Sequence, residues 1–306
     1  MPSVPGPETA SGSVRPALIL PRLKPADYLR LVLLAAIWGG SFIFIRVTAP
    51  ALGPFWMAEG RVLIGGLALL AWFAFTGFDP QWRRHARFYA VVGTVNSAIP
   101  FTLYGYAGLH LTASTMAFLN ATSPMFGLLL GAAFGFERIG VRRVAGLALG
   151  AAGVALVARP QAGDAGAMFG WAVGACLLAS FAYGLTGVVL KRWGQGVPAR
   201  GIAAGSQLAG AAALFPFLPF SVPAAAPSPL VLGNLAALGL LASGVAFLLY
   251  FRLMVDVGAT RALTVTFLVP LFAFLWGLIF LGEPLTAGIA AGGCLILAGT
   301  SLVTRS

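Results

Sequence analysis

Residues 101–157 read FTLYGYAGLHLTASTMAFLNATSPMFGLLLGAAFGFERIGVRRVAGLALGAAGVALV, and residues 247–303 read FLLYFRLMVDVGATRALTVTFLVPLFAFLWGLIFLGEPLTAGIAAGGCLILAGTSLV. The two stretches align without a gap at a constant offset of 146, and 17 of the 57 positions are identical. The distinctive identities are Phe101 with Phe247, Tyr104 with Tyr250, Pro124 with Pro270, Glu137 with Glu283, Gly146 with Gly292 and Gly153 with Gly299. The chain is therefore an internal duplication, and the segment between the copies decides how they are related.

The composition is that of an integral membrane protein. Mean hydropathy is +0.93, 59% of the residues are apolar and only 9% are charged, which is too few for the surface of a soluble domain. Apolar runs of about 20 residues match a helix crossing about 30 Å of hydrocarbon, and alternating strand-like segments are absent from the sequence. We expect an all-α fold with ten membrane spans, at 28–48, 56–76, 87–108, 113–133, 140–158, 168–190, 201–219, 230–251, 260–281 and 286–303.

The basic residues give the expected orientation. If the N-terminus is cytoplasmic, 16 of the 19 Lys and Arg residues fall on that side and only Arg46, Arg61 and Arg159 on the other. The positive-inside rule then places both termini in the cytoplasm of a bacterial inner membrane. The net charge of +11 is explained by topology and by anionic lipid, so no nucleic-acid partner is expected. Residues 1–27, rich in Pro, Gly and Ser, are expected to form a disordered cytoplasmic tail without a signal peptide.

The repeat predicts an inverted architecture. It extends to the first and sixth spans, where Trp38-Gly39-Gly40-Ser41 aligns with Tyr183-Gly184-Leu185-Thr186 at an offset of 145. Each half, 28–158 and 168–303, then holds five spans, with a periplasmic linker at 159–167. Five is odd, so the second half enters the membrane from the opposite side. Inverted repeats of this kind are typical of secondary transporters, with the substrate site at the repeat interface near the midplane.

Three duplicated motifs resemble the drug/metabolite transporter superfamily. They are the aromatic-Gly start of spans one and six, the prolines of spans four and nine, and the Glu before a Gly-rich last span in each half. More narrowly, residues 28–303 are similar to the EamA-type ten-helix exporters, including the aromatic amino-acid exporter group. The resemblance implies an inner-membrane exporter of amino acids or related metabolites. The second half departs from the pattern, with Tyr183 in place of Trp and Leu185 in place of the second Gly.

Polar and aromatic residues inside the spans are the candidate substrate contacts, since polar groups in a bilayer face a cavity or another helix. The candidates are Trp38, Ser41, Asn96, Tyr104, Asn120, Ser123, Tyr183, Thr186, Tyr250, Thr264 and Thr266. Tyr104 and Tyr250 lie near span ends, where an interfacial anchor is the competing interpretation. Asn96 is matched in the repeat by Ala242, which marks it as a residue that breaks the symmetry in favour of a substrate, or as a helix–helix contact.

Proline kinks are expected at Pro100, Pro124 and Pro270. Asn120 and Thr266 each lie four residues before one of the last two prolines, so their carbonyls lose the usual helical donor. The freed carbonyls form either a symmetric pair of polar notches near the bilayer centre or a kink capped by a neighbouring hydroxyl.

Glu137 and Glu283 precede the last span of each half, and there they either complement the dipole of the helix that follows or act as gates. Arg46, Glu59 and Arg61 are expected at the outer ends of spans one and two, in a structural pairing or as a guide for a charged substrate. Glycines of the last spans are expected to let backbones approach closely.

Missing motifs limit the mechanism. None of the eight acidic residues lies in the middle of an apolar run, and the sequence has no nucleotide-binding loop, histidine metal pair or nucleophile turn. We expect a non-enzymatic carrier with no cofactor, metal or ATPase subunit. It would use alternating access to export a small molecule, an amino acid, in a facilitated or gradient-driven process. The alternatives are a channel-like pore for small solutes and an exporter of other metabolites or drugs.

Overall fold

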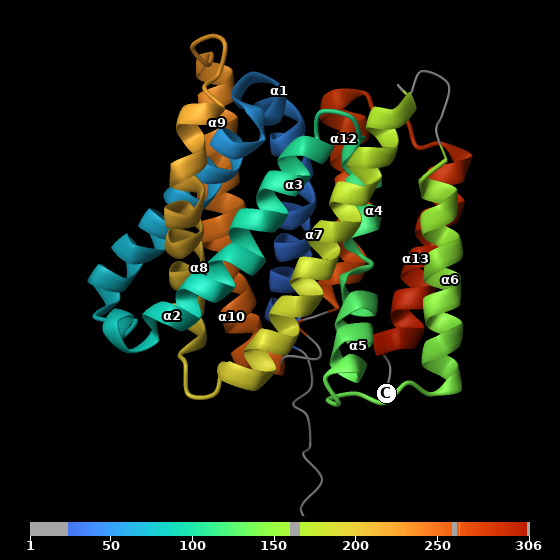
Figure 1. The fold of residues 1–306 in the computed structure, drawn as a ribbon, viewed down its shortest axis with the longest axis horizontal. Coiled ribbons are helices and arrows are strands. Elements are labelled where there is room, and N and C mark those ends of the chain that lie inside the picture. Colours follow the sequence, from blue (N-terminus) through green and yellow to red (C-terminus); the bar gives the residue numbers. More distant parts are fainter. Residues whose placement is uncertain (1–23, 160–165, 259–261, 263, 305–306) are drawn as a thin grey trace, which may run out of the picture.

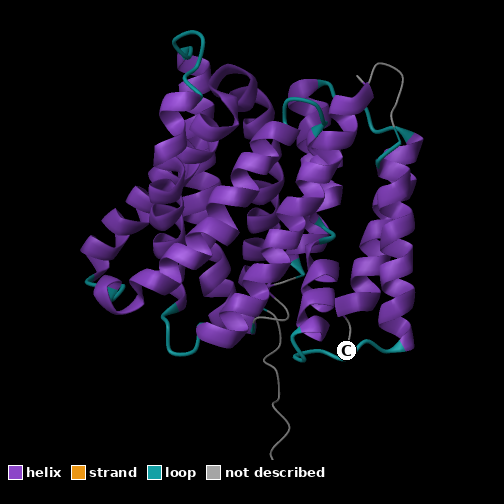
Figure 2. Ribbon diagram, in the orientation of Figure 1, coloured by secondary structure: helices purple, strands orange, loops and turns teal. Residues whose placement is uncertain are grey.

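The protein is a bundle of helices. The computed structural model describes residues 24–159, 166–258, 262 and 264–304, and over these ranges it contains helices and loops without a strand (Figure 2). The predicted all-α membrane class is confirmed. Residues 1–23 of the predicted tail, residues 160–165 of the predicted linker and residues 259–261 at the predicted start of span nine lie outside the described residues.

The helices follow one another with short connections. The first half contains α1 (Pro25–Thr76), α2 (Trp82–Gly93), η1 (Thr94–Ala98), α3 (Ile99–Ala107), α4 (Ala113–Asn120), α5 (Ser123–Ala133) and α6 (Val141–Val157). The second half contains α7 (Gly166–Trp193), α8 (Ala199–Leu214), η2 (Phe215–Phe220), α9 (Pro229–Ala237), η3 (Leu238–Val245), α10 (Ala246–Val257), α12 (Val265–Leu281) and α13 (Ala287–Thr304). Two of the short segments, η1 and η3, are π-helical, and η2 is a 3-10 helix.

The first two predicted spans are both parts of α1. Gly53 interrupts its helical backbone with φ 75° and ψ 163°, a conformation that glycine adopts without steric cost, and Pro50 and Pro54 flank it. The chain therefore reverses direction within one continuous stretch. The helix begins at Pro25, three residues before the predicted start of the first span.

The described elements make ten crossings between two faces of the bundle (Figure 1). We call the lower face the one where α5, α7, α10 and α13 end, and the upper face the one where α3, α6 and α12 end. Six helical runs among the described residues are long and apolar enough to cross a membrane, and α12 is a shorter apolar helix. The ten crossings exceed six because α1 holds two of them, α6 and α12 have 17 residues each, and the run of α2, η1 and α3 is not among the six.

The pair formed by α6 and α13 shows that the two halves are inverted. A Cβ on Gly146 would lie 2.7 Å from the Gly299 carbonyl oxygen, and a Cβ on Gly153 would lie 2.6 Å from that of Gly292. The repeat equates Gly146 with Gly292 and Gly153 with Gly299, and we call residues matched in this way repeat mates. Gly146 thus contacts the repeat mate of Gly153, and Gly153 contacts the repeat mate of Gly146. This reciprocal pattern requires the two helices to run antiparallel, and it permits the backbone contact expected of these glycines.

A second contact between the halves occurs twice, once between α1 and α12 and once between α7 and α5. A Cβ on Gly39 of α1 would lie 2.7 Å from Phe272 Cβ and 2.8 Å from the nitrogen of Ala273 in α12. Its mate Gly184 in α7 packs in the same way against residues 126–127 of α5, the repeat mates of residues 272–273. Each half therefore contributes a helix that packs on the other half, so the two repeats interlock.

Candidate functional site

A cavity of about 590 Å³ lies inside the bundle, and it collects most of the predicted site residues. Among the lining residues are Trp38, Ser41, Asn96, Tyr104, Asn120, Ser123, Pro124, Tyr183, Thr186, Tyr250 and Thr266. Three predicted residues do not line it: Thr264 is exposed just before α12, Pro100 lies in the first turn of α3, and Pro270 is buried inside α12. The cavity also uses α8, which the sequence did not assign to it, through Ile202 and Ser206.

The cavity reaches the lower face. Its wall includes Leu190 in the last turn of α7, Ala199 at the start of α8 and Met254 in the last turn of α10. These three positions all belong to the lower ends of their helices (Figure 1).

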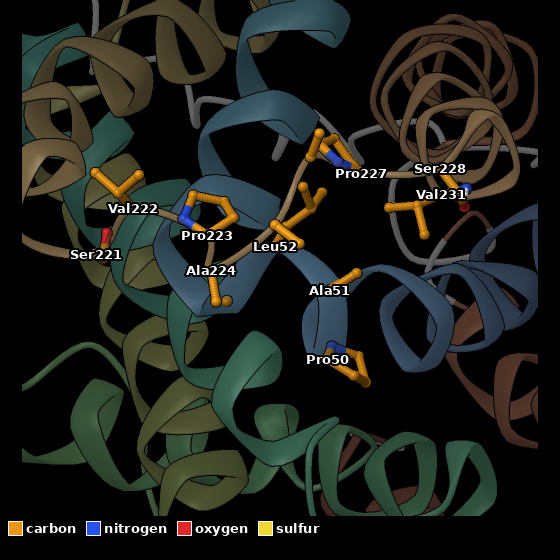
Figure 3. Close-up of a pocket in the computed structure, with 13 residues that line it drawn as sticks. Pro50, Ala51, Leu52, Ser221, Val222, Pro223, Ala224, Pro227, Ser228 and Val231 are labelled. Carbon is orange, nitrogen blue, oxygen red and sulfur yellow. Dashed lines mark hydrogen bonds between the residues drawn. The ribbon is translucent and has the colours of Figure 1, made fainter.

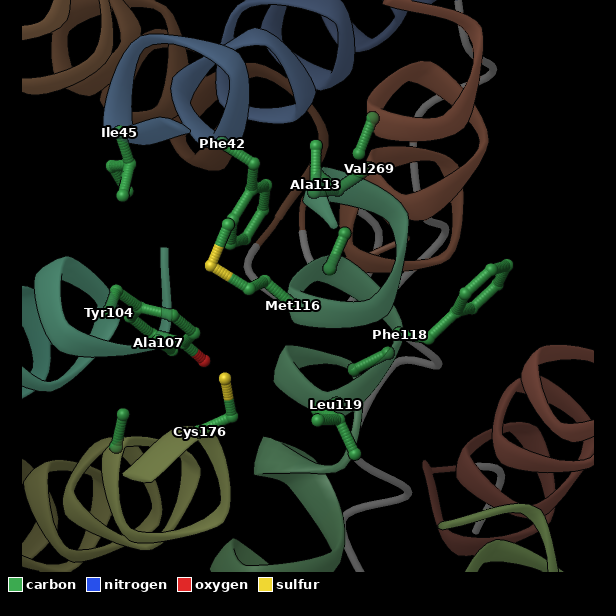
Figure 4. Packing of buried hydrophobic residues seen from close by; sticks show 14 of the residues in the cluster. Phe42, Ile45, Tyr104, Ala107, Ala113, Met116, Phe118, Leu119, Cys176 and Val269 are labelled. Carbon is green, nitrogen blue, oxygen red and sulfur yellow. The ribbon is translucent and has the colours of Figure 1, made fainter. Parts of the chain in front are cut away.

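Above the cavity the bundle is closed by packed apolar side chains. Figure 4 shows Phe42, Ile45, Tyr104, Ala107 and Met116 around this seal, and all five are buried. Ile45 and Ala107 lie one helical turn beyond the lining residues Phe42 and Tyr104, toward the upper face. The cavity is thus open toward one face and closed toward the other.

Two aromatic pairs related by the repeat lie in the cavity wall. Trp38 packs on Tyr250 with ring centroids 5.4 Å apart, and Tyr183 stacks on Tyr104 at 6.4 Å with an interplanar angle of 22°. Trp38 is the mate of Tyr183 and Tyr104 is the mate of Tyr250, so each pair joins one half to the other. The aromatic residues near span ends, Tyr104 and Tyr250, therefore face the interior and are not interfacial anchors.

The two π-helical segments occupy equivalent positions in the repeat and border the cavity. Asn96 lies in η1, and its mate Ala242 lies in η3. Trp38 Nε1 donates a hydrogen bond of 3.2 Å to the carbonyl oxygen of Ala242. A π-helical turn inserts one residue into the helical ladder and recurs at functional sites. Here it brings a backbone acceptor of one half to an aromatic donor of the other.

The fourth predicted span, 113–133, is broken beside Pro124, at Ala121 and Thr122 between α4 and α5. The carbonyl of Asn120, predicted to be free, accepts a hydrogen bond of 2.6 Å from Ser123 Oγ. The interpretation as a kink capped by a neighbouring hydroxyl is therefore correct for this proline. The Asn120 side chain does face the cavity, where its Oδ1 accepts a bond of 2.9 Å from the Tyr104 hydroxyl.

Arg61 is the main correction to the site. The sequence placed it at the outer end of span two, but its side chain is buried and lines the cavity. Its Nε donates to Ser243 Oγ at 3.1 Å, and its guanidinium carbon lies 3.7 Å from the centroid of the Phe101 ring. The missed signal was its distance from the turn: Gly53 ends the first crossing, so Arg61 lies two helical turns inside the second.

Ion pairs lie near both ends of the bundle, at positions that the repeat relates. Near the upper face, Arg46 Nε lies 2.8 Å from Glu283 Oε1, and Glu283 Oε2 accepts a bond of 2.8 Å from the backbone nitrogen of Ala113. Glu283 therefore caps α4 from a distance, and not the helix that follows it in sequence. We call the Arg46–Glu283 contact the upper ion pair.

Near the lower face, the repeat mates of these residues meet. Lys191 Nζ lies 3.2 Å from Glu137 Oε1, and Arg143 Nη1 lies 3.3 Å from its Oε2. The hydrogen bond from Lys191, together with the charges of both cations, lowers the pKa of Glu137 below its ordinary value. We call the Lys191–Glu137 contact the lower ion pair. It is more exposed than the upper one, with half of the Lys191 side chain accessible.

A second hollow of about 520 Å³ lies at the upper face, between the break in α1 and the segment that leads into α9 (Figure 3). Its wall includes Pro50, Leu52, Pro223, Pro227 and Val231. It contains no charged side chain among its described lining residues and none of the predicted site residues, so it is not the candidate site.

An antiparallel duplicated bundle with a central cavity closed toward one face defines a multi-pass membrane transporter of the inverted-repeat class. The model of the EamA-like transporter family matches the chain twice, over residues 27–159 and 170–305. The chain therefore belongs to the EamA-like transporter family, within the drug/metabolite transporter superfamily, as the repeated motifs indicated. It is a transporter and not an enzyme.

Curated relatives agree with this class. The chain is 25% identical over 276 residues to an uncharacterized transporter of Archaeoglobus fulgidus, covering 90% of this chain and 97% of the relative. It is 27% identical over 277 residues to a protein of Streptantibioticus cattleyicolor named "Probable terminal-alkyne amino-acid exporter", covering 90% and 92%. A solved crystal structure shares the fold with a TM-score of 0.64 at 20% identity, over 92% of this chain and 96% of that one.

Proposed function

We propose that the protein exports amino acids across a bacterial inner membrane by alternating access, with aromatic or large apolar amino acids as the preferred substrates. The observation that carries this proposal is the central cavity. Its described wall combines two aromatic pairs with a few polar groups and opens toward one face only. Pockets for small organic molecules have this composition. The relative named as an amino-acid exporter supports the same substrate class.

The proposed direction of transport is outward, down the substrate gradient. The cation count supports a cytoplasmic position for both termini and for the lower face, since 16 of the 19 Lys and Arg residues are expected on that side. The cavity then takes up substrate from the cytoplasm and releases it on the opposite side after the seal around Ile45 opens.

The two ion pairs suggest how the halves exchange conformations. In the inward-open arrangement the upper ion pair is largely buried and also holds α4, while the lower ion pair is partly exposed. We propose that residues 28–158 and 168–303 rock about the axis between α6 and α13. The upper pair would separate and the lower pair tighten as the cavity turns outward. A channel would need a continuous pore, whereas here packed side chains close the upper half.

Substrate binding is assigned to the cavity wall. Trp38 and Tyr183 would hold the apolar part of the substrate, with Tyr104 and Tyr250 as their stacking partners. Asn96, Asn120, Ser41, Ser123, Thr186 and Thr266 would supply hydrogen bonds. None of the described lining residues is acidic, so we propose facilitated export down the substrate gradient.

An uptake screen tests the substrate class. Purified protein in liposomes is given labelled amino acids one at a time, with and without a pH gradient. We expect accelerated, saturable uptake of aromatic and large apolar amino acids that is unaffected by the gradient. Acceleration of no amino acid would show that the substrate class is wrong, and uptake that requires the gradient would show that a proton is coupled.

A further inference from the structure

Arg61 is a buried cation without a carboxylate partner in the described part of the molecule. Only 7% of the residue is exposed. The ion pairs among the described residues involve Arg30, Arg46, Arg143, Lys191 and Arg252, and none involves Arg61. Its guanidinium instead contacts a neutral hydroxyl, that of Ser243, and the aromatic ring of Phe101. A guanidinium removed from water is costly unless an anion accompanies it, and a cavity that admits a ligand can receive that anion from the ligand.

The acid nearest in sequence does not supply the missing charge. Glu59 is two residues from Arg61, which on a helix turns it about 200° away. Glu59 is buried, does not line the cavity, and its Oε2 has no hydrogen-bond partner among the described residues. Arg61 is also the only charged side chain among the described lining residues of the cavity.

The repeat shows that Arg61 is an addition to one half and not part of the shared scaffold. A Cβ on Gly65 would lie 2.5 Å from Ser243 Cβ, and a Cβ on Gly210 would lie 3.1 Å from Ser97 Cβ. Ser243 is the mate of Ser97 at the offset of 146, and Gly65 corresponds to Gly210 at the offset of 145. The offset that relates Gly65 to Gly210 places Ser206 at the position of Arg61.

The serines at equivalent positions of the two halves have different hydrogen bonds because only one half carries the arginine. Ser243 Oγ accepts the hydrogen bond from Arg61 Nε, whereas Ser97 Oγ is buried without a partner among the described residues. The Ser206 hydroxyl, at the position of Arg61, bonds instead to the carbonyl of Ala203 in its own helix. Both Arg61 and Ser206 line the cavity. The two halves therefore present a cation on one side of the cavity and a neutral hydroxyl on the other.

We propose that Arg61 binds the carboxylate of the transported molecule and thereby selects substrates that carry a carboxylate over cations. This inference rests on the proposed transport of amino acids, and it names the group by which they are recognised. The planar guanidinium offers paired donors that match a carboxylate. The ring of Phe101 covers one face of the guanidinium, whose N–H donors lie in its own plane. Amines without a carboxylate would meet an uncompensated positive charge.

Three derivatives of phenylalanine that differ in which charged groups they carry test the proposal. Purified wild-type protein is titrated with L-phenylalanine, N-acetyl-L-phenylalanine and L-phenylalaninamide, with thermal stabilisation as the readout for binding. The same compounds then compete with labelled phenylalanine for uptake into liposomes. We expect the two carboxylates to stabilise the protein and compete, and the amide to be at least tenfold weaker. An amide that binds as well as the acid would overturn the proposal, as would a wild type that binds neither carboxylate.

Variants of Arg61 give the second arm. Arg61→Gln should weaken carboxylate binding at least tenfold and reduce the preference for acid over amide, while Arg61→Lys should retain part of both. Arg142→Gln, at an exposed arginine outside the cavity, is the matched control and should behave as the wild type. If Arg61→Gln does not fold, the wild-type series and Arg61→Lys decide. Equal binding of acid and amide by the wild type would count against the proposal, and so would a preference for acid over amide that is unchanged in Arg61→Lys.

The two proposals fail separately. Binding that requires the carboxylate and Arg61 but produces no flux of any amino acid would reject export and support the role of Arg61. Flux of amino acids with an unchanged preference in Arg61→Gln would support export and reject the role of Arg61.

Discussion

At the residue scale, the differences between the two halves gather around the cavity. In the repeat Trp38 is matched by Tyr183, Asn96 by Ala242 and Arg61 by Ser206, and all six residues line the cavity. Identities such as the glycines of α6 and α13 instead occur where helices pack. One asymmetric molecule bound between two nearly symmetric halves would account for this distribution.

Replacing Trp38 by Ala should weaken transport without unfolding the protein. The change removes the ring that packs on Tyr250 and the donor to the carbonyl of Ala242. A stacking contact between the Trp38 ring and the substrate would be worth about 0.5–1.5 kcal/mol, so we expect KM to rise roughly three- to tenfold when it is lost. Trp171→Ala, at an exposed position of α7, is the control. Equal uptake kinetics in both variants would remove Trp38 from the site.

Asn96→Ala should reduce uptake while the melting temperature stays unchanged. Within the described part of the chain the Asn96 side chain has no hydrogen-bond partner, yet it lines the cavity, so its amide is available to a substrate. Asn234→Ala, which removes a surface bond to the carbonyl of Leu230, serves as the control. A melting temperature that falls without a change in uptake would favour a packing role for Asn96.

At the element scale, three irregular segments shape the cavity: η1, the break between α4 and α5, and η3. The π-helical turns of η1 and η3 lie at matching positions of the repeat. The break between α4 and α5 has no counterpart in the described part of α12, which continues through Pro270. Hydroxyls stabilise the break: the Leu119 carbonyl accepts from Ser180 Oγ at 3.0 Å, and the Ala121 carbonyl accepts from Thr300 Oγ1 at 2.8 Å. These bonds tie the break to α7 and α13, so it is a built part of the wall.

Gly153→Ala should destabilise the protein through the α6–α13 contact. The new Cβ would lie 2.6 Å from the Gly292 carbonyl oxygen, and a backbone atom cannot move aside as a flexible side chain would. We expect a loss of about 1–3 kcal/mol, typical of an overpacked interface, measured as a lower melting temperature in detergent. Gly174→Ala, with nothing within 4 Å of its Cβ, is the control and should be neutral or stabilising by about 0.5–1 kcal/mol. A stable Gly153→Ala variant would contradict the described packing.

The sequence predicted the elements better than their irregularities. The ten spans were predicted from the lengths of the apolar runs and the short polar breaks between them. The described helices follow these spans closely, as for α6, predicted at 140–158 and found at Val141–Val157. The π-helical turns were not predicted because they arise from packing between helices and not from residue preference. The depth of Arg61 was misjudged because a charge was assumed to lie at a span end, while the turn at Gly53 places it inside.

The candidate site shows the same division. Most of the polar and aromatic residues predicted from within apolar runs do line the cavity, because such side chains in a bilayer face a cavity or another helix, but they make up less than half of its described wall. Thr264 was included on that ground, but it precedes α12 and is exposed. The contribution of α8 was missed because most of its lining residues, such as Ile202 and Ala203, are apolar and carry no signal in sequence.

At the scale of the whole molecule, the two ion pairs should control opposite faces. Glu283→Gln removes the charge that holds Arg46 and weakens the contact with Ala113, so the upper seal should open more often. A cysteine at Ala49, buried in the upper half, would report this opening in a protein whose two native cysteines are replaced. We expect faster labelling by an impermeant maleimide than in the parent protein. Labelling that speeds up equally in Glu137→Gln would show that the effect is not specific to the upper face.

The lower ion pair should make stability depend on acidity. The pKa of Glu137 is lowered in the folded protein, mainly by the hydrogen bond from Lys191. The contribution of ionised Glu137 to the free energy of unfolding is therefore fully present above its ordinary pKa of about 4.3. It is lost as the pH falls through the lower pKa that Glu137 has in the folded protein. Between pH 7 and pH 3 the wild type should lose more thermal stability than Glu137→Gln. Parallel loss in the two proteins would assign acid sensitivity to other groups.

The central claim is that this EamA-family protein is a carrier with one cavity that faces the two sides of the membrane in turn, and counterflow tests it most directly. Liposomes with the protein are loaded with unlabelled phenylalanine and diluted into a trace of labelled phenylalanine. A carrier predicts a transient accumulation of label that saturates with substrate and disappears when the liposomes are empty. A flux or conductance that neither saturates nor depends on internal phenylalanine would show a pore and contradict the account.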